Sequence, residues 1–331
     1  MDIPSHLVFY ADDQPGIVRK KRGRGYQFLC PEGKPITRNE ELQRLKTLVI
    51  PPAWQHVWIS PMKNGHLQST GKDEKRRKQY IYHPDYMAYR QMSKFQKMAA
   101  FGAQLPAVRE YYEKDLTLDS WTKRKMLALV TYLLDHYHFR VGNWQYMRDN
   151  ETYGLTTLRR KHLNEIDNDL QLSYKAKSGK QRKVRINNPK AAKLIREISE
   201  LPGYEIFRYK NNQGKYETLD SSEVNEYLKG TMDGSFTAKD FRTWGASLLA
   251  IEKYEAAKEE LTKNQRLKFE PTLVKKVARQ MGNTLSVCRQ YYIHPEVLEF
   301  LTNAYPKTLD LPTARKRLKR SEEFLLKIIS S

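Results

Sequence analysis

Two rhythms of apolar positions divide the chain into a first part that predicts strands and a second part that predicts helices. Roughly the first eighty residues hold short runs of β-branched and aromatic residues between Gly and Pro positions. We expect strands at residues 7–10, 26–30, 57–60, 67–69 and 79–82. One helix interrupts them, because Thr37 and Glu40 fit a capping box. An apolar stripe then follows at Leu42, Leu45 and Leu48.

From about residue 90 onward, apolar residues recur every three or four positions, as they do on one face of a helix. Residues 122–137 show the clearest stripe, formed by Met126, Leu127, Leu129, Val130, Leu133 and Leu134. Further helices are expected at residues 244–261, 271–280 and 295–303. One β island lies among them. Residues 170–176 and 184–186 alternate in polarity, and Ser178-Gly179 supplies the turn of a hairpin.

These patterns predict an α+β protein of two domains. A small β-rich domain is expected at residues 1–90, and a larger, mainly helical domain with a β-hairpin at residues 91–331. A length of 331 residues is enough for about two domains that each bury a core. We place the boundary near residues 84–92, where the apolar rhythm changes.

The charge of the chain predicts a polyanionic partner. The formal net charge is +21, from 59 Lys and Arg against 38 Asp and Glu. No basic amphipathic helix stands out, which favours nucleic acid over a membrane surface. No apolar run approaches the ~18 residues of a membrane span. The N-terminus lacks the charged and apolar regions of a signal peptide, so we expect none.

Cysteine and glycine patterns exclude several classes of site. Cys30 and Cys288 lie far apart and form no CxxC pattern, so we expect no structural disulfide and a reducing, cytoplasmic compartment. The eight histidines show no zinc spacing. The phosphate-cradling GxxxxGK[ST] pattern is absent, and Gly23-Arg24-Gly25 is only a fragment of a dinucleotide fingerprint. We therefore expect no ATP, NAD or metal cofactor.

Candidate chemistry begins with Arg242-Thr243-Trp244, followed fifty residues later by Tyr291-Tyr292. A guanidinium near a phenol, in a chain this basic, suits an enzyme that attacks a phosphodiester with tyrosine. Free tyrosine has a pKa of about 10, so about one phenol in a thousand is ionised at neutral pH. Guanidinium groups lower that pKa and stabilise the charge of the transition state.

Each residue also has an ordinary structural interpretation. Alone, Arg140 balances the dipole of the helix that it follows, and Arg242 forms a surface ion pair. Lys177 at a hairpin tip is by default solvated, although lysine is an acid whose pKa burial can adjust. A hairpin that only binds a nucleic-acid backbone is a strong alternative, because cations surround Lys177 at Lys175, Lys180, Arg182 and Lys183.

Taken in order, Arg140, Lys177, Arg242 and the tyrosine pair resemble the active site of the small pox-virus-like and bacterial type IB DNA topoisomerases. Composition does not separate Tyr291 from Tyr292, and adjacent residues of a helix point about 100° apart, so only one can face the site. The family's spacing from Asn283 selects Tyr292 as nucleophile.

The resemblance also implies a role for each of these residues. It makes Arg140 and Arg242 stabilisers of the transition state, and Lys177 the acid that protonates the leaving 5′ oxygen. The pox-virus pattern has His where this chain has Asn283. An asparagine donates a hydrogen bond but cannot titrate, so the group that removes the proton of Tyr292 stays open, with water the simplest candidate.

The resemblance covers nearly the whole chain and extends to DNA contacts. Residues 71–82 interleave five cations with two aromatics, which suits phosphates and sugars or bases. A charged edge strand is the alternative. The expected DNA-binding residues are Lys72, Lys75, Arg76, Arg77, Tyr80, Tyr82, Tyr146 and Lys239. The basic clusters at residues 19–24 and 315–320 are left open between DNA contact and solvated surface.

The sequence thus predicts a monomeric type IB DNA topoisomerase that closes as a clamp around duplex DNA. It would relax supercoils through a 3′-phosphotyrosyl intermediate without ATP or metal, in the cytoplasm and on the nucleoid of a bacterium. A tyrosine recombinase is one alternative, although those enzymes usually carry His where Lys239 stands. A non-catalytic basic nucleic-acid-binding protein is the other.

Overall fold

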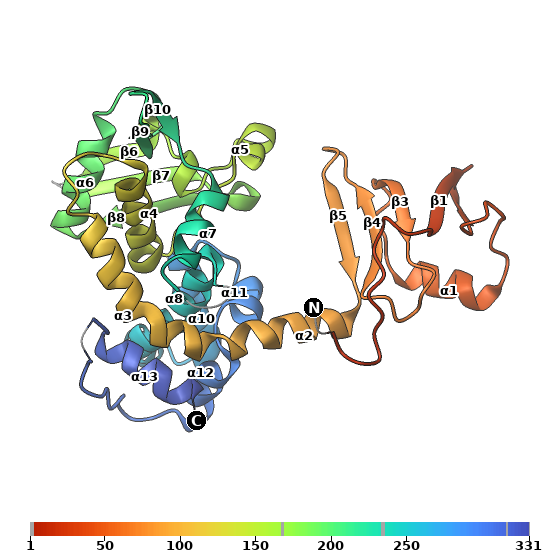
Figure 1. Ribbon diagram of the computed structural model, residues 1–331. Helices are drawn as coiled ribbons and strands as arrows, with labels where there is room; N and C mark the ends of the chain where they lie inside the picture. The colour runs from red at the N-terminus through yellow and green to blue at the C-terminus, as the bar shows by residue number, and fades with distance from the viewer. Residues whose placement is uncertain (1–2, 167–168, 233–235, 316, 331) are drawn as a thin grey trace. The chain divides into compact units, whose positions relative to one another are not determined.

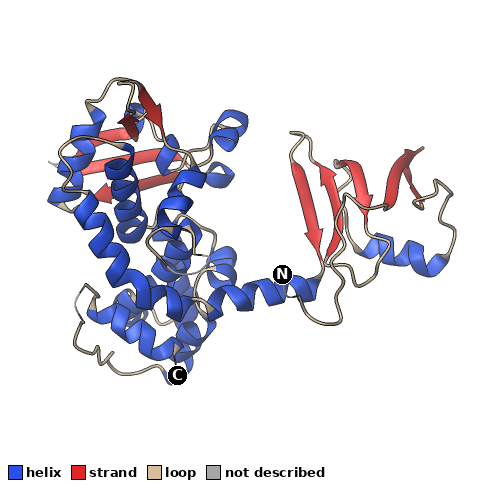
Figure 2. Ribbon diagram, viewed as in Figure 1, coloured by secondary structure: helices blue, strands red, loops and turns tan. Residues whose placement is uncertain are grey.

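The computed structural model describes residues 3–166, 169–232, 236–315 and 317–330. The chain divides into two compact units, Met1–Gln96 and Lys97–Ser331 (Figure 1). Strands dominate the first unit, and helices with small sheets make up the second (Figure 2). The predicted α+β class is therefore confirmed. Among the described residues, no helix combines the length and apolarity needed to cross a bilayer.

The first unit contains a five-stranded antiparallel sheet in the order β2-β1-β3-β4-β5. Its elements are β1 (Ile17–Arg22), β2 (Gly25–Leu29), α1 (Asn39–Thr47), β3 (Gln55–Ile59), β4 (Leu67–Lys72), β5 (Lys78–Tyr82) and α2 (Pro84–Gln96). Four of the five predicted strands are confirmed as β2 to β5. The strand predicted at residues 7–10 is wrong, because only Val8 pairs there, in a single bridge to Gly65. Strand β1 was missed.

A small core lies between the sheet and α1. Ile17, Leu45, Val57 and Ile59 are buried in it, so the predicted leucine stripe does face the sheet through Leu45. The predicted capping box is wrong. The helix begins one residue later, its N-cap is Arg38, and no side chain caps it. Two carboxylates in its first turn still complement the helix dipole.

Residues 84–92, the expected boundary between domains, lie inside α2. That helix ends at Gln96, and α3 (Met98–Asp115) starts after the single residue Lys97. The division between the compact units falls at the same place.

The second unit is built mainly from helices around one three-stranded sheet and one short hairpin. After α3 it contains α4 (Lys123–Tyr137), α5 (Trp144–Asn150), β6 (Leu163–Ile166), β7 (Asp169–Lys175), β8 (Gln181–Ile186), α6 (Pro189–Ser199), β9 (Arg208–Lys210), β10 (Tyr216–Thr218), α7 (Ser221–Lys229), α8 (Ala238–Glu252), α9 (Tyr254–Lys263), α10 (Phe269–Met281), α11 (Leu285–Tyr291), α12 (Pro295–Glu299) and α13 (Arg320–Ile329). The helix expected at residues 122–137 is confirmed as α4, with Thr122 as its N-cap.

The predicted hairpin is confirmed as β7 and β8, and β6 adds a third antiparallel strand. A 3₁₀ turn at Lys177–Gly179 joins β7 to β8. Ser178 and Gly179 both adopt left-handed backbone there, with φ of 64° and 73°. Lys177 therefore sits at the tip of a tight, defined turn.

Helix α8 is buried on every side from Phe241 to Ile251, as expected for the central helix of a helical domain. The sequence placed its start near residue 244, but it begins at Ala238. Asp240 explains the early start, because its carboxylate accepts a hydrogen bond from the backbone N–H of Thr237 at 2.7 Å. Arg242 consequently lies within the helix and not ahead of it.

Candidate active site

Arg140 lies on a short extended segment that leaves the end of α4. His138 ends the helix in left-handed backbone, with φ of 52°. The segment is then fixed by the backbone N–H of Leu155, which donates to the Arg140 carbonyl at 2.8 Å. Gly142 has φ of +106°, and a Cβ there would lie 2.7 Å from the Thr156 hydroxyl. Glycine is required at this position, so the backbone around Arg140 has little freedom.

Asn283 joins the two catalytic arginines that the sequence predicted. Its side-chain oxygen accepts hydrogen bonds from Arg140 Nη2 at 2.5 Å and from Arg242 Nη2 at 3.2 Å. Arg242 also donates to the carbonyls of His138 and Met281. The amide oxygen is thus used within the protein, which leaves the amide nitrogen as the group that can meet a substrate.

Tyr292 is the C-cap of α11 and lies beside these arginines. The guanidinium carbon of Arg242 is 5.2 Å from the centroid of the Tyr292 ring. Ser247 on α8 donates to the Tyr292 carbonyl at 3.4 Å and accepts from the backbone N–H of His294 at 2.9 Å. The helix that carries Arg242 therefore also holds the backbone of the tyrosine.

The environment of Tyr292 favours its ionised form. Burial alone would raise the pKa of the phenol, but the positive charges of Arg242 and Arg140 outweigh burial and lower that pKa below its usual value. Lys177 adds a smaller effect in the same direction, although its side chain is exposed at the hairpin tip. Arg140, Arg242 and Asn283 thus lie together beside Tyr292, and Lys177 is close enough for its charge to act on the phenol.

Several buried donors in this cluster have no hydrogen-bond partner among the described residues. They are Arg140 Nη1, Arg242 Nε, Asn283 Nδ2, and Nε and Nη1 of Arg182. Buried donors are normally paired, so a group of them indicates a place for an acceptor. Guanidinium and amide donors match the oxygens of a phosphate.

Arg182 is the residue of this cluster whose position the sequence analysis missed. It was grouped with the exposed cations of the hairpin, yet it is only 4% exposed and donates to the carbonyls of Tyr137 and His138. Its register gave a usable signal. Arg182 shares the face of β8 that carries Val184 and Ile186, the residues that predicted the strand.

The DNA-binding residues predicted in the first unit lie on β4, β5 and the turn between them. Lys72, Lys75 and Arg76 are exposed. Arg77 forms an ion pair with Asp73 at 2.7 Å. Tyr80 is 47% exposed and stacks on Tyr82, with ring centroids 5.9 Å apart. Cations and a flat aromatic surface are therefore presented together, and the DNA contact stays a prediction.

Two further predicted contacts lie in the second unit. Tyr146 on α5 is 53% exposed, and Asn143 caps that helix by accepting from the backbone N–H of Tyr146 at 3.0 Å. Lys239 is exposed in the first turn of α8, three positions before Arg242. Both side chains are accessible to solvent, and their roles as DNA contacts stay predictions.

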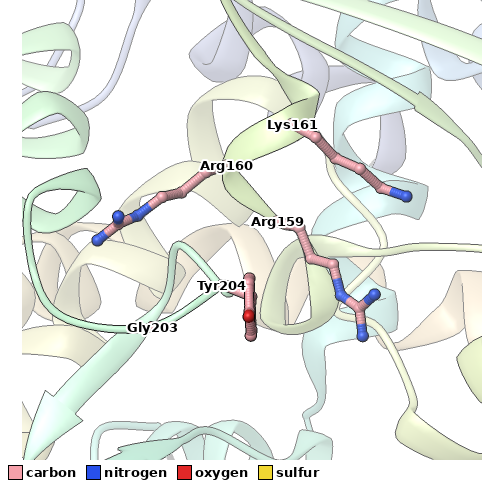
Figure 3. Close-up of a pocket in the computed structure, with 5 residues that line it drawn as sticks. All are labelled: Arg159, Arg160, Lys161, Gly203 and Tyr204. Atoms are coloured by element: carbon pink, nitrogen blue, oxygen red, sulfur yellow. The ribbon is translucent and has the colours of Figure 1, made fainter.

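A separate basic hollow of about 510 Å³ lies on the second unit (Figure 3). It is lined by Arg159, Arg160, Lys161, Gly203 and Tyr204. Figure 3 shows Arg160 and Lys161 extending in opposite directions. Arg160 donates to the Leu201 carbonyl, so part of the charge already has a partner in the protein. None of the five predicted catalytic residues lines this hollow.

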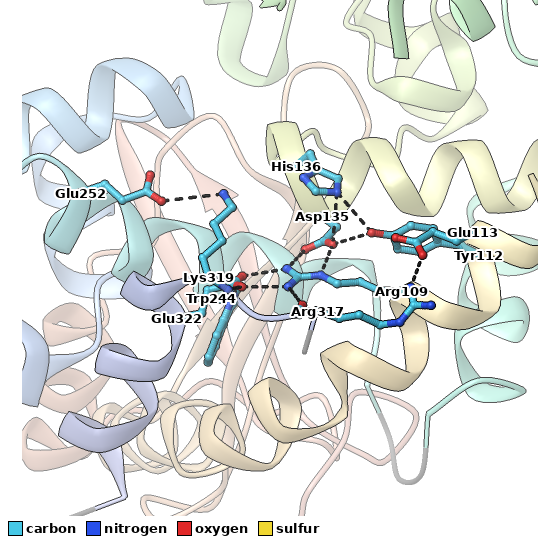
Figure 4. Close-up of polar contacts among 10 residues, drawn as sticks. All are labelled: Arg109, Tyr112, Glu113, Asp135, His136, Trp244, Glu252, Arg317, Lys319 and Glu322. Carbon is cyan, nitrogen blue, oxygen red and sulfur yellow. Dashed lines mark hydrogen bonds and ion pairs between the residues drawn. The ribbon is translucent and has the colours of Figure 1, made fainter. Parts of the chain in front are cut away.

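A buried ion-pair network anchors α8 to the rest of the unit (Figure 4). Arg109 on α3 pairs with Asp135 on α4 at 2.8 Å and with Glu322 on α13 at 2.7 Å. Glu322 also accepts from Trp244 Nε1 at 3.3 Å, two residues after Arg242. Burial alone would raise the pKa of Asp135, but Arg109 lowers it to about 2.

Comparisons with known proteins bear on the whole of this arrangement. Residues 69–319 match the family model of the eukaryotic DNA topoisomerase I catalytic core. Residues 25–73 match the model of the bacterial DNA topoisomerase IB N-terminal domain. The match to DNA topoisomerase 1B of Acanthamoeba polyphaga mimivirus is 28% identical over 295 residues, which is 87% of this chain and 88% of the viral one.

Two more relatives differ in how much of them is matched. DNA topoisomerase 1B of vaccinia virus, strain Copenhagen, is 20% identical over 279 residues, which is 83% of this chain and 85% of the viral one. DNA topoisomerase 1 beta of Arabidopsis thaliana is 29% identical over 156 residues, which is 47% of this chain but 16% of the longer plant protein.

Proposed function

Because more than half of its length matches the catalytic core of DNA topoisomerase I, the chain belongs to that family, and we propose how its residues carry out the reaction. It is a type IB DNA topoisomerase, which relaxes supercoiled duplex DNA by transient cleavage of one strand. The observation that carries the assignment of residues is the convergence of Arg140, Arg242 and Asn283 beside the Tyr292 ring.

In the first step, Tyr292 gives its phenol proton to water, and its oxygen attacks the scissile phosphorus. A bond forms between that oxygen and phosphorus while the bond from phosphorus to the 5′ oxygen breaks. Arg140 and Arg242 donate to the non-bridging oxygens, where negative charge grows in the transition state. The unpaired amide nitrogen of Asn283 supports this proposal, because it offers one more donor at the same place.

In the same step, the ammonium group of Lys177 gives a proton to the departing 5′ oxygen. The product is a 3′-phosphotyrosyl bond and a free 5′ hydroxyl. The strand that ends in this hydroxyl swivels around the intact strand and releases torsion. Religation reverses the chemistry: the hydroxyl attacks phosphorus, its proton returns to Lys177, and Tyr292 leaves and takes back a proton from water. The number of phosphoester bonds is conserved, so no nucleotide is consumed.

The first unit is proposed to close with the second around duplex DNA as a monomeric clamp. Exposed cations and aromatics in both units support this proposal, at Lys72 to Tyr82 in one and at Tyr146, Lys177 and Lys239 in the other. The single residue Lys97 between α2 and α3 is the expected hinge. A bacterial cell and its nucleoid are the expected setting, on the strength of the N-terminal family match.

Relaxation of a supercoiled plasmid in EDTA without nucleotide tests the function. The expected result is a ladder of relaxed topoisomers, together with a protein-linked strand whose 5′ end is free. A non-catalytic DNA-binding protein would leave the plasmid supercoiled. A tyrosine recombinase would join labelled strands from two duplexes into a stable recombinant product, and that result would overturn the proposal.

A further inference from the structure

Arg182 is a charged residue in a position that its strand reserves for apolar side chains. In β8 the exposed residues Gln181, Lys183 and Arg185 alternate with inward positions. Arg182 occupies one of these inward positions, and its cross-strand partner Tyr174 is buried too. Burying a guanidinium is unfavourable unless it is paired, so this placement needs a compensating role.

The contacts of Arg182 are with the backbone that carries Arg140. Its Nη2 donates to the carbonyls of Tyr137 and His138 at 3.0 and 3.1 Å. Its guanidinium carbon also lies 5.0 Å from the centroid of the Phe139 ring. These carbonyls belong to the end of α4, where helix carbonyls lack partners within the helix. Three consecutive residues before Arg140 are therefore held by one side chain.

The His138 carbonyl is a junction between two arginines. Arg242 Nη1 donates to the same oxygen that accepts from Arg182 Nη2. A Cβ built on Gly282, the residue before Asn283, would also lie 3.4 Å from Arg182 Cδ. Arg182 thus binds the segment before Arg140, shares an acceptor with Arg242 and lies against the residue before Asn283. Lys177 precedes Arg182 in the same hairpin.

The arginines of this cluster repel one another in the free protein. Burial and the nearby charges of Arg140 and Arg182 lower the pKa of Arg242. Among the described residues, no ion pair joins Arg140, Arg182 or Arg242 to a carboxylate. Retaining a third buried cation beside two others opposes stability, so its presence points to a role other than stability.

We propose that Arg182 is a positioning residue for DNA cleavage, which holds the backbone ahead of Arg140 against the hairpin and against Arg242. The inference rests on the catalytic roles proposed above for Arg140 and Arg242. Arg182 acts through its bonds to two carbonyls, so its effect is on the transition state that those arginines stabilise and not on DNA affinity.

Single-turnover cleavage by Arg182→Gln and Arg182→Lys tests the proposal. A misplacement of about 1 Å at a reacting centre can slow a reaction by about 10²-fold, so Arg182→Gln is expected to cleave about 10- to 100-fold more slowly. Arg182→Lys should fall between, because it keeps the charge and a donor nitrogen but lacks the flat guanidinium that lies over the Phe139 ring. DNA affinity should stay near the parent's value, and the melting temperature should not fall, because the substitution removes one of three mutually repelling buried cations.

The matched control is Arg185→Gln. It removes the same charge from the same strand, but Arg185 is exposed and pairs with Asp169. It should cleave at the parent's rate. A second readout uses DNA with sulfur at the bridging 5′ position, which needs no acid to leave. Arg182→Gln should be equally slow on this substrate, because its defect lies at the arginines.

Each other outcome counts against the proposal. Normal cleavage by Arg182→Gln would overturn it, as would a loss that merely follows a fall in melting temperature. Full recovery on the sulfur substrate would show that Arg182 serves Lys177 alone. Arg140→Ala distinguishes failure of the role of Arg182 from failure of the proposed catalytic roles. Normal cleavage by Arg140→Ala would reject the catalytic roles. Slow cleavage by Arg140→Ala together with normal cleavage by Arg182→Gln would reject only the role of Arg182.

Discussion

At the scale of single residues, two oxygen atoms join the arginines of the site. The side-chain oxygen of Asn283 accepts from both Arg140 and Arg242, and the His138 carbonyl accepts from both Arg242 and Arg182. Asn283 cannot titrate, but its side-chain oxygen holds two guanidinium groups side by side.

The choice between the two tyrosines is the most direct residue-level prediction. Tyr292→Phe is expected to bind DNA but to form no covalent adduct, because the Tyr292 ring lies beside Arg242. Tyr291→Phe is the matched control and should keep its activity. The measurement is denaturing electrophoresis of protein linked to labelled DNA, and an adduct formed by Tyr292→Phe would disprove the assignment.

Changing the leaving group distinguishes Lys177, the proposed acid, from Arg242, a proposed stabiliser of the transition state. A 5′-bridging sulfur leaves as a stable thiolate and needs no proton. Lys177→Ala is therefore expected to cleave ordinary DNA slowly and the sulfur substrate almost normally. Arg242→Ala should lose on the order of 10²-fold or more on both substrates. Equal impairment of Lys177→Ala on the two substrates would assign Lys177 to binding instead.

The lowered pKa of Tyr292 can be observed in the free protein. The parent's tyrosinate absorbance minus that of Tyr292→Phe should show one phenol that ionises below the usual pH. In an Arg140→Gln background the same difference should move to higher pH, because removing a nearby cation raises the pKa of the phenol. An unchanged midpoint would mean that Arg140 does not act on Tyr292.

At the scale of elements, regular spacing of apolar residues predicted helices and strands well, whereas runs of charged residues hid a strand. The apolar stripe of α4 and the alternation of β7 and β8 predicted these elements correctly, because burial selects their residues directly. Strand β1 was missed, since only Ile17 of its six residues is buried and four are cations. Its pairing is carried by backbone groups, which have no sequence signature.

The sequence named five residues of the candidate site, but it did not show Arg182 or the contacts that join them. Arg140, Lys177, Arg242 and Tyr292 follow from a family resemblance and its spacing. The helix around Arg242 was placed too late, because Thr237 and Asp240, which cap its start, were not used as a start signal. The shared carbonyl of His138 is a backbone atom of an unremarkable residue, so only the folded chain reveals it.

The network between α3, α4 and α13 predicts a specific acid sensitivity. The pKa of Asp135 is lowered from 3.8 to about 2. Above pH ~4 the carboxylate is charged in both the folded and unfolded states, and its contribution of about 2 kcal/mol to the free energy of unfolding is complete. That contribution is lost as the pH falls from about 4 towards about 2.

Urea unfolding from pH 7 down to pH 3 measures this contribution in Asp135→Asn. The difference in unfolding free energy from the parent should be constant above pH ~4 and shrink below it. Glu226→Gln is the control, because its ion pair with Lys229 is exposed and should contribute ~0.5 kcal/mol or less. A difference that does not change with pH would assign the effect to packing.

At the scale of the whole molecule, the net charge of +21 is useful only if many cations reach DNA together. A protein that contacts about 6–10 phosphates loses about 10³–10⁵ in affinity between 50 and 200 mM salt. The full chain is expected to show such a slope, whereas the second unit alone should show a flatter slope and retain slow cleavage.

Limited proteolysis supplies the control for this clamp. Bound DNA should protect the junction at Lys97 in the full chain, if the two units close around the duplex. Equal salt slopes for the full chain and the second unit, with a junction that is cut equally with and without DNA, would rule out the clamp.

The contact between Trp244 and Glu322 also has a consequence for biosynthesis. The two residues are 78 positions apart, and a ribosome adds about 5–20 residues per second, so Glu322 is made about 4–16 s after Trp244. In that interval the growing chain already contains its catalytic arginines, while the helix that carries Arg242 still lacks its anchor on α13. A chain that has not yet been extended through α13 therefore lacks the partner that Trp244 Nε1 has in the folded protein.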